Sequence, residues 1–399
     1  MLTDAPQNIV RIGVLFSLHG PYESISNELF KGAMLAVHKI NQSTEYSFSI
    51  EPVVRDPGGS LDGYRTAAVD LLTRQNVSHV VGCYTSSSRK EVIPVFEKYD
   101  GLLWYPSHYE GYESCSNVIY TGASPNQYLV PLLSHMLAHY GHRIYCVGSN
   151  YIWSWENNRT ARALAAPSGA EILSERYVNV GSTDVAHIID EILRVRPSFV
   201  FSSLIGTSSH EFIRQFALAN AKVSAPPLPI CSATISEPEL RAAGPQAASN
   251  IITSSVYFQS IDSSANDSFV RSYKARYGDE SVTSEDAEAA YIAVMLLAKS
   301  IESAGTAEVG HVKTALHQVS FAAPQGLVRI DPATNHCFLT ACVGRSEADG
   351  QFTIIWSAGS AMKPDPYMLV SDIAAFRSMY GVDTVTTSSS IFSKAKAKV

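Results

Sequence analysis

The feature that most constrains the fold of this chain is a regular alternation of short apolar strands with amphipathic helices. Residues 9–16 form an apolar run typical of a buried strand. The next segment repeats an apolar residue every three or four positions, at Leu29, Ala33, Val37 and Ile40. That spacing marks one face of a helix. The alternation continues with strands predicted at 48–54, 80–84 and 102–105, and helices at 61–74 and from about Arg89. It demands a mainly parallel sheet that is covered by helices on both faces.

The same pattern starts again near Tyr140. Strands are predicted at 143–148, 171–178 and 199–204, with helices between them, and a further strand ends near Ser232. The 399 residues of the chain are also more than one core usually needs. We therefore predict an α/β protein of two doubly wound parallel-sheet lobes. Ligands of such open sheets bind beyond the carboxyl ends of the strands, so the loops after the strands are the candidate site.

The composition excludes several classes of partner. The formal net charge of −7 disfavours direct binding to nucleic acid or to an anionic membrane surface. No stretch approaches the roughly 18 consecutive apolar residues of a membrane span. The short polar segment 1–8 lacks the features of a signal peptide. We expect a cytoplasmic protein, with a periplasmic protein whose signal peptide was removed as the alternative.

Neither the cysteines nor the histidines form a convincing metal site. The six cysteines contain no C-x-x-C pair and are expected to be reduced and mostly buried. His135 and His139 stand four residues apart on a helix but have no acidic partner near them in the sequence. We read them as a flank of an amphipathic helix, and we predict neither a metal nor a cofactor.

Catalytic signatures are missing as well. The chain has no G-x-S-x-G elbow, Walker loop, G-x-G-x-x-G or H-E-x-x-H motif. Asp56, Glu110 and Asp286 are scattered, and nothing in the sequence pairs them as acid and base. We expect that the protein is not an enzyme.

Two loops of the first lobe carry candidate ligand-binding residues. In residues 82–91, Ser88 and Glu91 match an S-x-x-E capping box, whereas Ser86 precedes the expected cap and faces the crevice. The loop after the strand at 102–105 brings Tyr105 and Ser107, which offer an apolar wall and hydroxyl groups together. Packing between the lobes is the structural alternative for this aromatic loop.

The matching loops of the second lobe hold a further set of candidates. Tyr151 and Trp153 alternate with Ile152 and are expected to point the same way. Thr234 follows another strand, from which its hydroxyl reaches the cleft.

Motifs along the whole chain support a resemblance to a known family. They are Asp56-Pro57-Gly58-Gly59, Val81-Gly82-Cys83-Tyr84 with Ser86, Arg89-Lys90, Tyr105-Pro106, Tyr109-Glu110-Gly111, Pro125-Asn126-Gln127, Tyr151-Ile152, Ser260-Ile261-Asp262, Ala323-Pro324-Gln325-Gly326 and Pro364-Asp365-Pro366-Tyr367. From residue 12 to 370 the chain resembles the type I periplasmic-binding-protein-like fold, and within it the cytoplasmic amide sensors that negatively regulate bacterial aliphatic amidase operons.

The resemblance implies an architecture and a site. It implies three crossovers, with lobe 1 built from residues 8–122 and 257–335 and lobe 2 from 123–256 and 336–380. The Thr/Ser-rich tail at 381–399 is expected to be disordered. The implied site holds a small amide between two groups of residues, Tyr84, Ser86, Tyr105 and Ser107 on one side and Tyr151, Trp153 and Thr234 on the other.

The resemblance also implies a partner. Regulators of this family sequester an RNA-binding antitermination protein and release it when the amide binds. The chain departs from the family at three pocket positions, where threonine, proline and tyrosine are usual and this chain has Ser107, His108 and Trp153. These departures leave the identity of the amide open, and the oligomeric state is also open, with a homo-oligomer as one option.

The main alternative is a substrate-binding protein of a urea or short-chain amide ABC transporter. Such proteins share the middle motifs, including Leu103-Trp104-Tyr105-Pro106. Both interpretations predict a small neutral amide or urea-like ligand. They differ in the partner, which is an antitermination protein in one and a membrane permease in the other.

Overall fold

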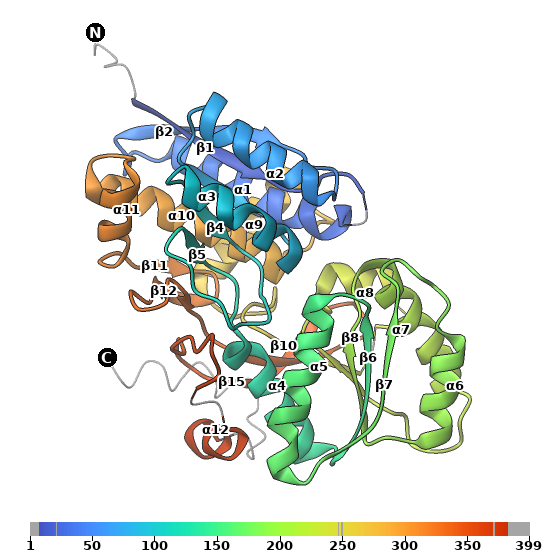
Figure 1. Cartoon of the computed structure of the whole chain (residues 1–399). Helices are drawn as coiled ribbons and strands as arrows, with labels where there is room; N and C mark the ends of the chain where they lie inside the picture. The colour runs from blue at the N-terminus through green and yellow to red at the C-terminus, as the bar shows by residue number, and fades with distance from the viewer. Residues whose placement is uncertain (1–7, 21, 246, 249, 370–371, 382–399) are drawn as a thin grey trace.

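The protein has two α/β lobes that lie side by side, with the chain passing repeatedly between them (Figure 1). The structure, a computed structural model, describes residues 8–20, 22–245, 247–248, 250–369 and 372–381. The tail expected at 381–399 lies outside the described residues except for Gly381. None of the described helices combines the length and the apolar character that a membrane crossing needs.

The first lobe is built on a five-stranded parallel sheet with the strand order β2-β1-β3-β4-β5. Its strands are β1 (Asn8–Leu15), β2 (Phe48–Arg55), β3 (His79–Gly82), β4 (Leu102–Tyr105) and β5 (Val118–Tyr120). Its helices are α1 (Glu23–Gln42), α2 (Leu61–Val69) with the π-helical turn Asp70–Arg74, α3 (Ser86–Lys98), α9 (Ser264–Tyr277), α10 (Glu285–Ala304) and α11 (Val309–Leu316).

Alternate residues of these strands pack on opposite faces of the sheet. Val14 and Trp104 belong to the apolar cluster that includes α1 and α10, whereas Leu15 and Leu103 belong to the cluster under α2 and α3. A strand buried on both faces has no polar alternation, which is why the predicted strands appear as continuous apolar runs. The strand predicted at 102–105 is confirmed residue for residue.

Helix α10 packs against α1, and this contact makes a segment far along the chain part of the first lobe. At the crossing, a Cβ atom on Gly32 would lie 1.9 Å from the carbonyl oxygen of Ala287. Only a residue without a side chain allows the two backbones to approach this closely. Since Ala287 lies in the first turn of α10, this packing also fixes the position of that turn against α1.

The second lobe has a seven-stranded sheet with the order β15-β14-β10-β9-β8-β6-β7. Its strands are β6 (Arg143–Ser149), β7 (Glu171–Val178), β8 (Phe199–Ser203), β9 (Ile230–Ser232), β10 (Ile251–Ser255), β14 (Cys342–Ser346) and β15 (Phe352–Ser357). Its helices are α4 (Pro125–His139), α5 (Ile152–Ala165) with the 3-10 turn Ala166–Ser168, α6 (Ala186–Val195), α7 (Gly206–Asn220), α8 (Glu237–Ala243) and α12 (Ile373–Tyr380).

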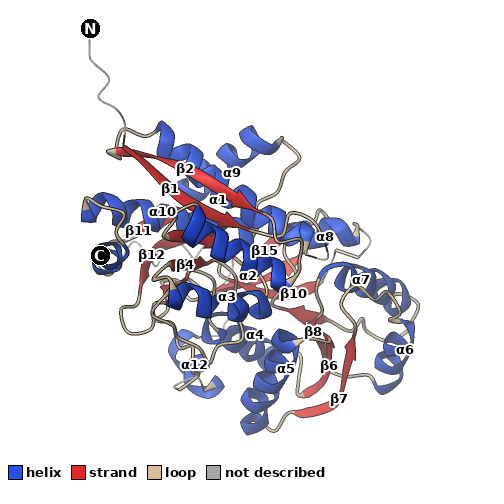
Figure 2. Ribbon diagram, turned by 45° about the horizontal axis from the view of Figure 1, so that its top comes forward, coloured by secondary structure: helices blue, strands red, loops and turns tan. Residues whose placement is uncertain are grey.

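Five strands of this sheet are parallel, and the two late strands β14 and β15 extend one edge in antiparallel pairing. Helices α4 and α5 pack beside each other over the sheet, while α6, α7 and α8 pack in sequence on the other side (Figure 2). The sheet is mainly parallel, as predicted, and the antiparallel strands β14 and β15 are an addition to the prediction. The predicted strand at 171–178 is confirmed.

The chain passes between the two large sheets three times: between β5 and α4, between β10 and α9, and between β12 and β14. A small antiparallel sheet of β11 (Phe321–Ala323), β12 (Gly326–Ile330) and β13 (Cys337–Phe338) stands at the third passage. Three crossovers and two doubly wound lobes are the type I periplasmic binding protein fold, as predicted. This arrangement places the carboxyl ends of β3, β4, β6 and β9 around the space between the lobes.

Candidate functional site

The first wall of the candidate site begins where β3 ends. After Gly82 the backbone of Cys83 enters the left-handed region with φ of 66°, so the strand stops and the chain turns into α3. The helix is capped by Thr85, whose side chain accepts a hydrogen bond from the Ser88 amide at 3.1 Å. The predicted capping box at Ser88 and the helix start near Arg89 are therefore wrong. The reason is that Thr85 stands in extended backbone directly before the helix and supplies the cap oxygen itself.

The loop thereby places Ser86 at the first helical position, buried and facing Glu110. The Ser86 hydroxyl donates a short hydrogen bond to the carboxylate of Glu110. The Arg89 guanidinium holds the same carboxylate at 3.4 Å and binds Glu113 at 2.7 Å. Burial opposes ionisation of Glu113, but the charge and hydrogen bonds of Arg89 prevail and lower the pKa of Glu113 to about 2. The Ser86 hydroxyl is thus held by a carboxylate that is itself fixed by its ion pair with Arg89.

Tyr105 supports the same wall from β4. Its hydroxyl donates to the carbonyl oxygen of Tyr84 at 2.6 Å, and its ring stacks over the Arg89 guanidinium at 4.7 Å. The side chain is fully buried. Tyr105 therefore links the end of β4 to the end of β3. The ring of Tyr84 lies near that of Tyr22, with 6.0 Å between the two ring centroids.

Ser107 and His108 complete the first wall. Ser107 is buried, and its Oγ has no hydrogen-bond partner among the described residues. The ring of His108 contacts the rings of Tyr128 at 5.6 Å and Trp153 at 5.3 Å. Burial lowers the pKa of His108 to about 4, so the imidazole is neutral at pH 7.

The second wall comes from the start of α5 and the end of β9. Tyr151 precedes α5, and Trp153 lies in its first turn; their rings are 6.3 Å apart and inclined by only 23°. The expected common direction of these two side chains is confirmed. Trp153 is 4% exposed, and its indole nitrogen has no partner in the described part of the chain. The Thr234 hydroxyl donates to the Leu204 carbonyl oxygen at 3.1 Å.

The structure brings the two walls together through the ring contact between His108 of the first wall and Trp153 of the second. Tyr84 and Tyr151 also influence each other: burial raises the pKa of Tyr84 well above its ordinary value, and the neighbouring Tyr151 raises it further. Thr234 lies across a small pocket from His108. The predicted residues therefore surround one region between the lobes, with Tyr105 as a support behind it.

A small pocket occupies the His108 end of this region. Its lining comes from both lobes and consists of His108, Ala233, Thr234, Ile235, Ser236, Glu237, Thr253, Ser255, Tyr257, Phe258, Glu285 and Asp286. Its free volume is about 10 Å³, which is roughly the room that one water molecule needs. In this arrangement of the lobes, only a ligand of a few atoms fits after a small adjustment.

Of the three acidic residues of the pocket, Glu237 and Glu285 were missed by sequence reasoning, and Asp286 was noted only as a scattered acid. Glu237, at the start of α8, is fully buried, and burial raises its pKa to about 7. Burial likewise raises the pKa of Glu285 to about 8 and that of Asp286 to about 7. The neighbouring acids Asp286, Glu288 and Glu237 add to the effect at Glu285. No sequence signal links Glu237 to Glu285 and Asp286, because Glu237 reaches the pocket from α8 of the second lobe and the other two from α10 of the first.

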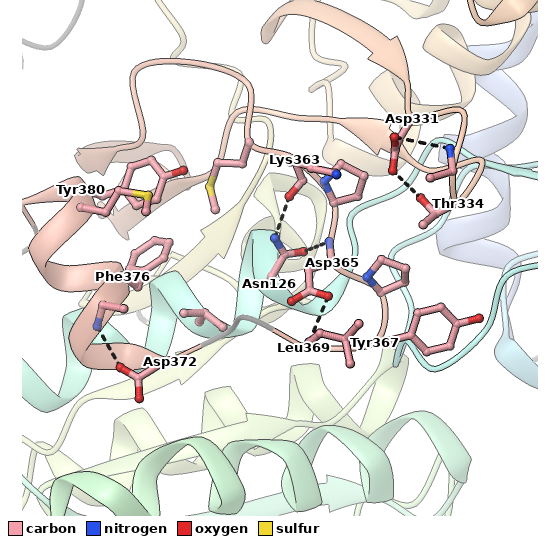
Figure 3. A pocket seen from close by; sticks show the side chains of 17 residues that line it. Asn126, Asp331, Thr334, Lys363, Asp365, Tyr367, Leu369, Asp372, Phe376 and Tyr380 are labelled. Atoms are coloured by element: carbon pink, nitrogen blue, oxygen red, sulfur yellow. Dashed lines mark hydrogen bonds between the residues drawn. The ribbon is translucent and has the colours of Figure 1, made fainter.

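A larger hollow among the described residues lies elsewhere. It has a volume of about 420 Å³ and lies between α12, the segment around residues 363–369 and the start of α4 (Figure 3). Its polar groups bind one another: the Asn126 amide donates to the Lys363 carbonyl oxygen at 2.9 Å, and its oxygen accepts from the Asp365 amide at 2.8 Å. A hollow whose polar groups are already paired offers little to a polar ligand, and none of the predicted site residues lines it.

The described residues contain no group of three or more His, Cys, Asp or Glu side chains that is placed to hold a metal ion. His135 and His139 lie with ring centroids 4.4 Å apart on α4. All six cysteines, each in a described position, are free thiols. Five of them are buried, and Cys115 is half-buried.

Comparison with solved structures supports the fold. A benzoate-bound solute-binding protein of an ABC transporter from R. palustris superposes with a TM-score of 0.78 and 18% identity, over 90% of this chain and 98% of that chain. A p-hydroxybenzoic acid complex from Rhodopseudomonas palustris HaA2 gives 0.79 and 18%, over 91% and 100%. An isoleucine-bound branched-chain amino acid binding protein from Streptococcus pneumoniae gives 0.75 and 19%, over 90% and 100%.

A curated relative covers much less. A protein named limonene hydroxylase from Geobacillus stearothermophilus is 29% identical over 114 residues, which is 29% of this chain and 21% of that protein. The chain thus spans about a fifth of the length of this relative. The family comparison covers most of the chain, since the model described as periplasmic binding protein domain matches residues 10–372. Together with the two lobes and three crossovers, this match establishes that the chain belongs to the periplasmic binding protein domain family.

Proposed function

We propose that the chain is a sensor that closes its two lobes on a small neutral amide or urea-like molecule. The observation that carries this proposal is the buried pocket between the lobes, with its free volume of about 10 Å³ and its lining of hydroxyls, aromatic rings, carboxyl groups and a neutral imidazole. In this proposal Thr234 lines the pocket directly. Tyr84, Ser86, Ser107, Tyr151 and Trp153 continue the site from the pocket, and Tyr105 supports it from behind.

The charge of the pocket favours a neutral ligand over the carboxylates bound by some structural neighbours. The pocket lining has no Lys or Arg, so a benzoate or amino acid carboxylate would be buried without a cation. An unpaired buried charge is costly. Near neutral pH, the raised pKa values of Glu237 and Glu285 also keep these groups partly protonated. A neutral, hydrogen-bonding molecule is the best complement to such a lining.

Binding without turnover fits the arrangement of the candidate nucleophiles. The Ser86 hydroxyl donates to Glu110, which Arg89 holds as part of an ion-paired network. The Ser107 hydroxyl has no partner among the described residues, so no base orients it. Nucleophilic catalysis needs a hydroxyl with a base in hydrogen-bond reach. We infer that the chain acts by binding alone and is not an enzyme.

The signal of such a sensor is the geometry of the lobes. A ligand shifts an open–closed equilibrium only by its differential affinity for the two states. A partner that binds the open form is released on closure, and by linkage it weakens ligand binding by the same factor. We propose that this partner is an RNA-binding antitermination protein, that the chain acts in the cytoplasm, and that it controls expression of an amidase operon.

A substrate-binding protein of a urea or short-chain amide transporter is the second candidate. The fold shared with solute-binding proteins of ABC transporters favours it. The two candidates share the pocket chemistry and differ only in the partner.

The ligand part of the proposal is tested by thermal unfolding with added ligands. A ligand at 100 times its dissociation constant stabilises the fold by about 2.7 kcal/mol. Acetamide, propionamide and urea are therefore expected to raise the melting temperature, and leucine, glutamate and benzoate are not. A larger shift with any of these carboxylates than with every neutral amide would refute it.

The partner part is tested by co-expression with the antitermination protein encoded nearest to the chain, followed by pull-down with and without acetamide. A complex that forms without ligand and dissociates with acetamide supports the regulator. Absence of that complex, together with binding to a membrane permease, decides for the transport protein.

A further inference from the structure

Three buried oxygen atoms of the interlobe pocket lack hydrogen-bond partners in the described part of the chain. They are Oε2 of Glu237, Oε1 of Glu285 and Oγ1 of Thr253. Glu237 is fully buried, and Glu285 and Thr253 are 9% and 2% exposed. Burying a polar atom without a partner destabilises a protein. Three such atoms around one pocket mark a place where a ligand completes the hydrogen bonding.

The two carboxyl groups are held in place by their other oxygen atoms. Oε1 of Glu237 accepts from the Gln259 amide at 2.8 Å. Oε2 of Glu285 accepts from the Ser255 hydroxyl at 2.7 Å. Each carboxyl group is therefore fixed, and each keeps one oxygen for a donor that enters the pocket. A carboxylate accepts hydrogen bonds at both oxygens, and a protonated carboxyl still accepts at its carbonyl oxygen, so the complementary group donates them.

The elements that carry these acids lie on different lobes. Glu285 starts α10, which packs against α1 of the first lobe, whereas Glu237 and Thr253 belong to α8 and β10 of the second lobe. A single group that donates to both carboxyls would bridge the two lobes directly. It would thus favour the closed arrangement over the open one.

We propose that Glu237 and Glu285 form a subsite for a planar group with two or more N–H donors, such as the NH₂ of a primary carboxamide, a urea or a guanidine. This inference rests on the proposed function in placing the ligand between the lobes. It adds a requirement that the proposed function does not contain, namely that the nitrogen end of the ligand bridges two acids on opposite lobes. Ligands of the same size that lack N–H groups are excluded by it.

The experiment is calorimetric titration of the full chain with acetamide, urea, N,N-dimethylacetamide, acetate and low millimolar guanidinium chloride. The chain is compared with the Glu237→Gln and Glu285→Gln variants. Glu280→Gln, at an exposed position of the loop before α10, serves as the matched control. Melting curves establish that each variant is folded, and Thr253→Val gives a second, uncharged probe of the subsite.

The expected result is that acetamide and urea bind and that N,N-dimethylacetamide binds at least about tenfold more weakly. At pH 9, above the pKa values of about 7 for Glu237 and about 8 for Glu285, both groups are charged. Loss of a hydrogen bond to a charged group, worth about 1.5–3 kcal/mol, then corresponds to a weakening of roughly 10- to 150-fold in each glutamine variant. The Glu280→Gln control should bind like the unmodified chain.

The outcomes separate this inference from the proposed function. If guanidinium alone binds and the glutamine variants lose it, the subsite stands and the neutral-amide function falls. If both acetamides bind equally and the variants bind like the unmodified chain, the subsite is overturned and the amide function stands. If acetate binds best, or no probe binds, both are overturned.

Discussion

Replacing Glu285 by glutamine is expected to stabilise the protein, and increasingly so as the pH rises. In the native protein, burial raises the pKa of Glu285 from its ordinary value of 4.5 to about 8, and the nearby acids Asp286, Glu288 and Glu237 add to this. The native state therefore binds the proton more tightly than the unfolded chain does. The resulting stabilisation is fully present below pH 4.5 and is lost as the pH rises to about 8.

The size of this loss follows from the two pKa values. Each pH unit between 4.5 and about 8 costs about 1.36 kcal/mol, which gives a loss on the order of 5 kcal/mol. Glutamine keeps an oxygen that accepts from Ser255 and carries no charge at any pH. With an unfolding entropy of about 2.1 cal/mol/K for each residue, the advantage of the variant corresponds to roughly 6 °C at pH 8.5 and little at pH 5.

The assay is differential scanning calorimetry of the unmodified chain and of Glu285→Gln between pH 5 and pH 9. Heat is the appropriate denaturant, because urea and guanidinium carry the N–H groups that the subsite is proposed to bind. Glu280→Gln removes an exposed carboxyl from the loop before α10 and should follow the unmodified chain at every pH. A constant offset between Glu285→Gln and the unmodified chain across this range would refute the reasoning, since it would mean that Glu285 is not a buried acid.

Three further changes test the packing of the site and of the fold. Trp153→Ala should cost about 3–5 kcal/mol of stability. It should also lower the affinity for acetamide and allow longer amides to bind. An unchanged order of preference in calorimetric titration would place Trp153 outside the site. Arg89→Met removes the buried cation of Glu110 and Glu113 and leaves them only the half-exposed Lys90. It should lower stability by about 3–5 kcal/mol in thermal unfolding, and a change below 1 kcal/mol contradicts the buried network. Gly32→Ala forces a Cβ atom to within 1.9 Å of the Ala287 carbonyl oxygen. It should cost at least about 3 kcal/mol, and a variant that melts like the unmodified chain disproves the close helix contact.

The regular elements of the fold could be predicted well because their signals are local. The strands at 102–105 and 171–178 were predicted to the residue. The start of α3 was not, because four adjacent hydroxyl residues at 85–88 can each cap a helix. Thr85 does so in the structure because the left-handed turn at Cys83 sets where the strand ends. The competition among equivalent caps is decided by tertiary structure, which a local pattern does not contain.

The candidate site was predictable only in part, for a related reason. Residues at strand ends, such as Tyr84 and Thr234, follow from the rule that ligands bind at the carboxyl edge of the sheet. His108 stood out in the sequence only as a departure from the family, yet its ring joins the two lobes by contacting Trp153. Glu237 and Glu285 are distant in the sequence and meet only because α10 returns to the first lobe. Contacts of this kind depend on topology.

The acids of the subsite also have an energetic meaning for function. Glu285 stands at the start of α10, where the helix dipole favours a carboxylate, and yet burial raises its pKa. The fold alone would therefore be more stable with an uncharged residue there. Departures from the most stable choice are expected where function requires them. A donor that enters between Glu237 and Glu285 offsets the cost of both acids at once, and it does so only when the lobes are close together. The ligand therefore binds the closed arrangement more tightly than the open one, and this difference in affinity is what closure requires.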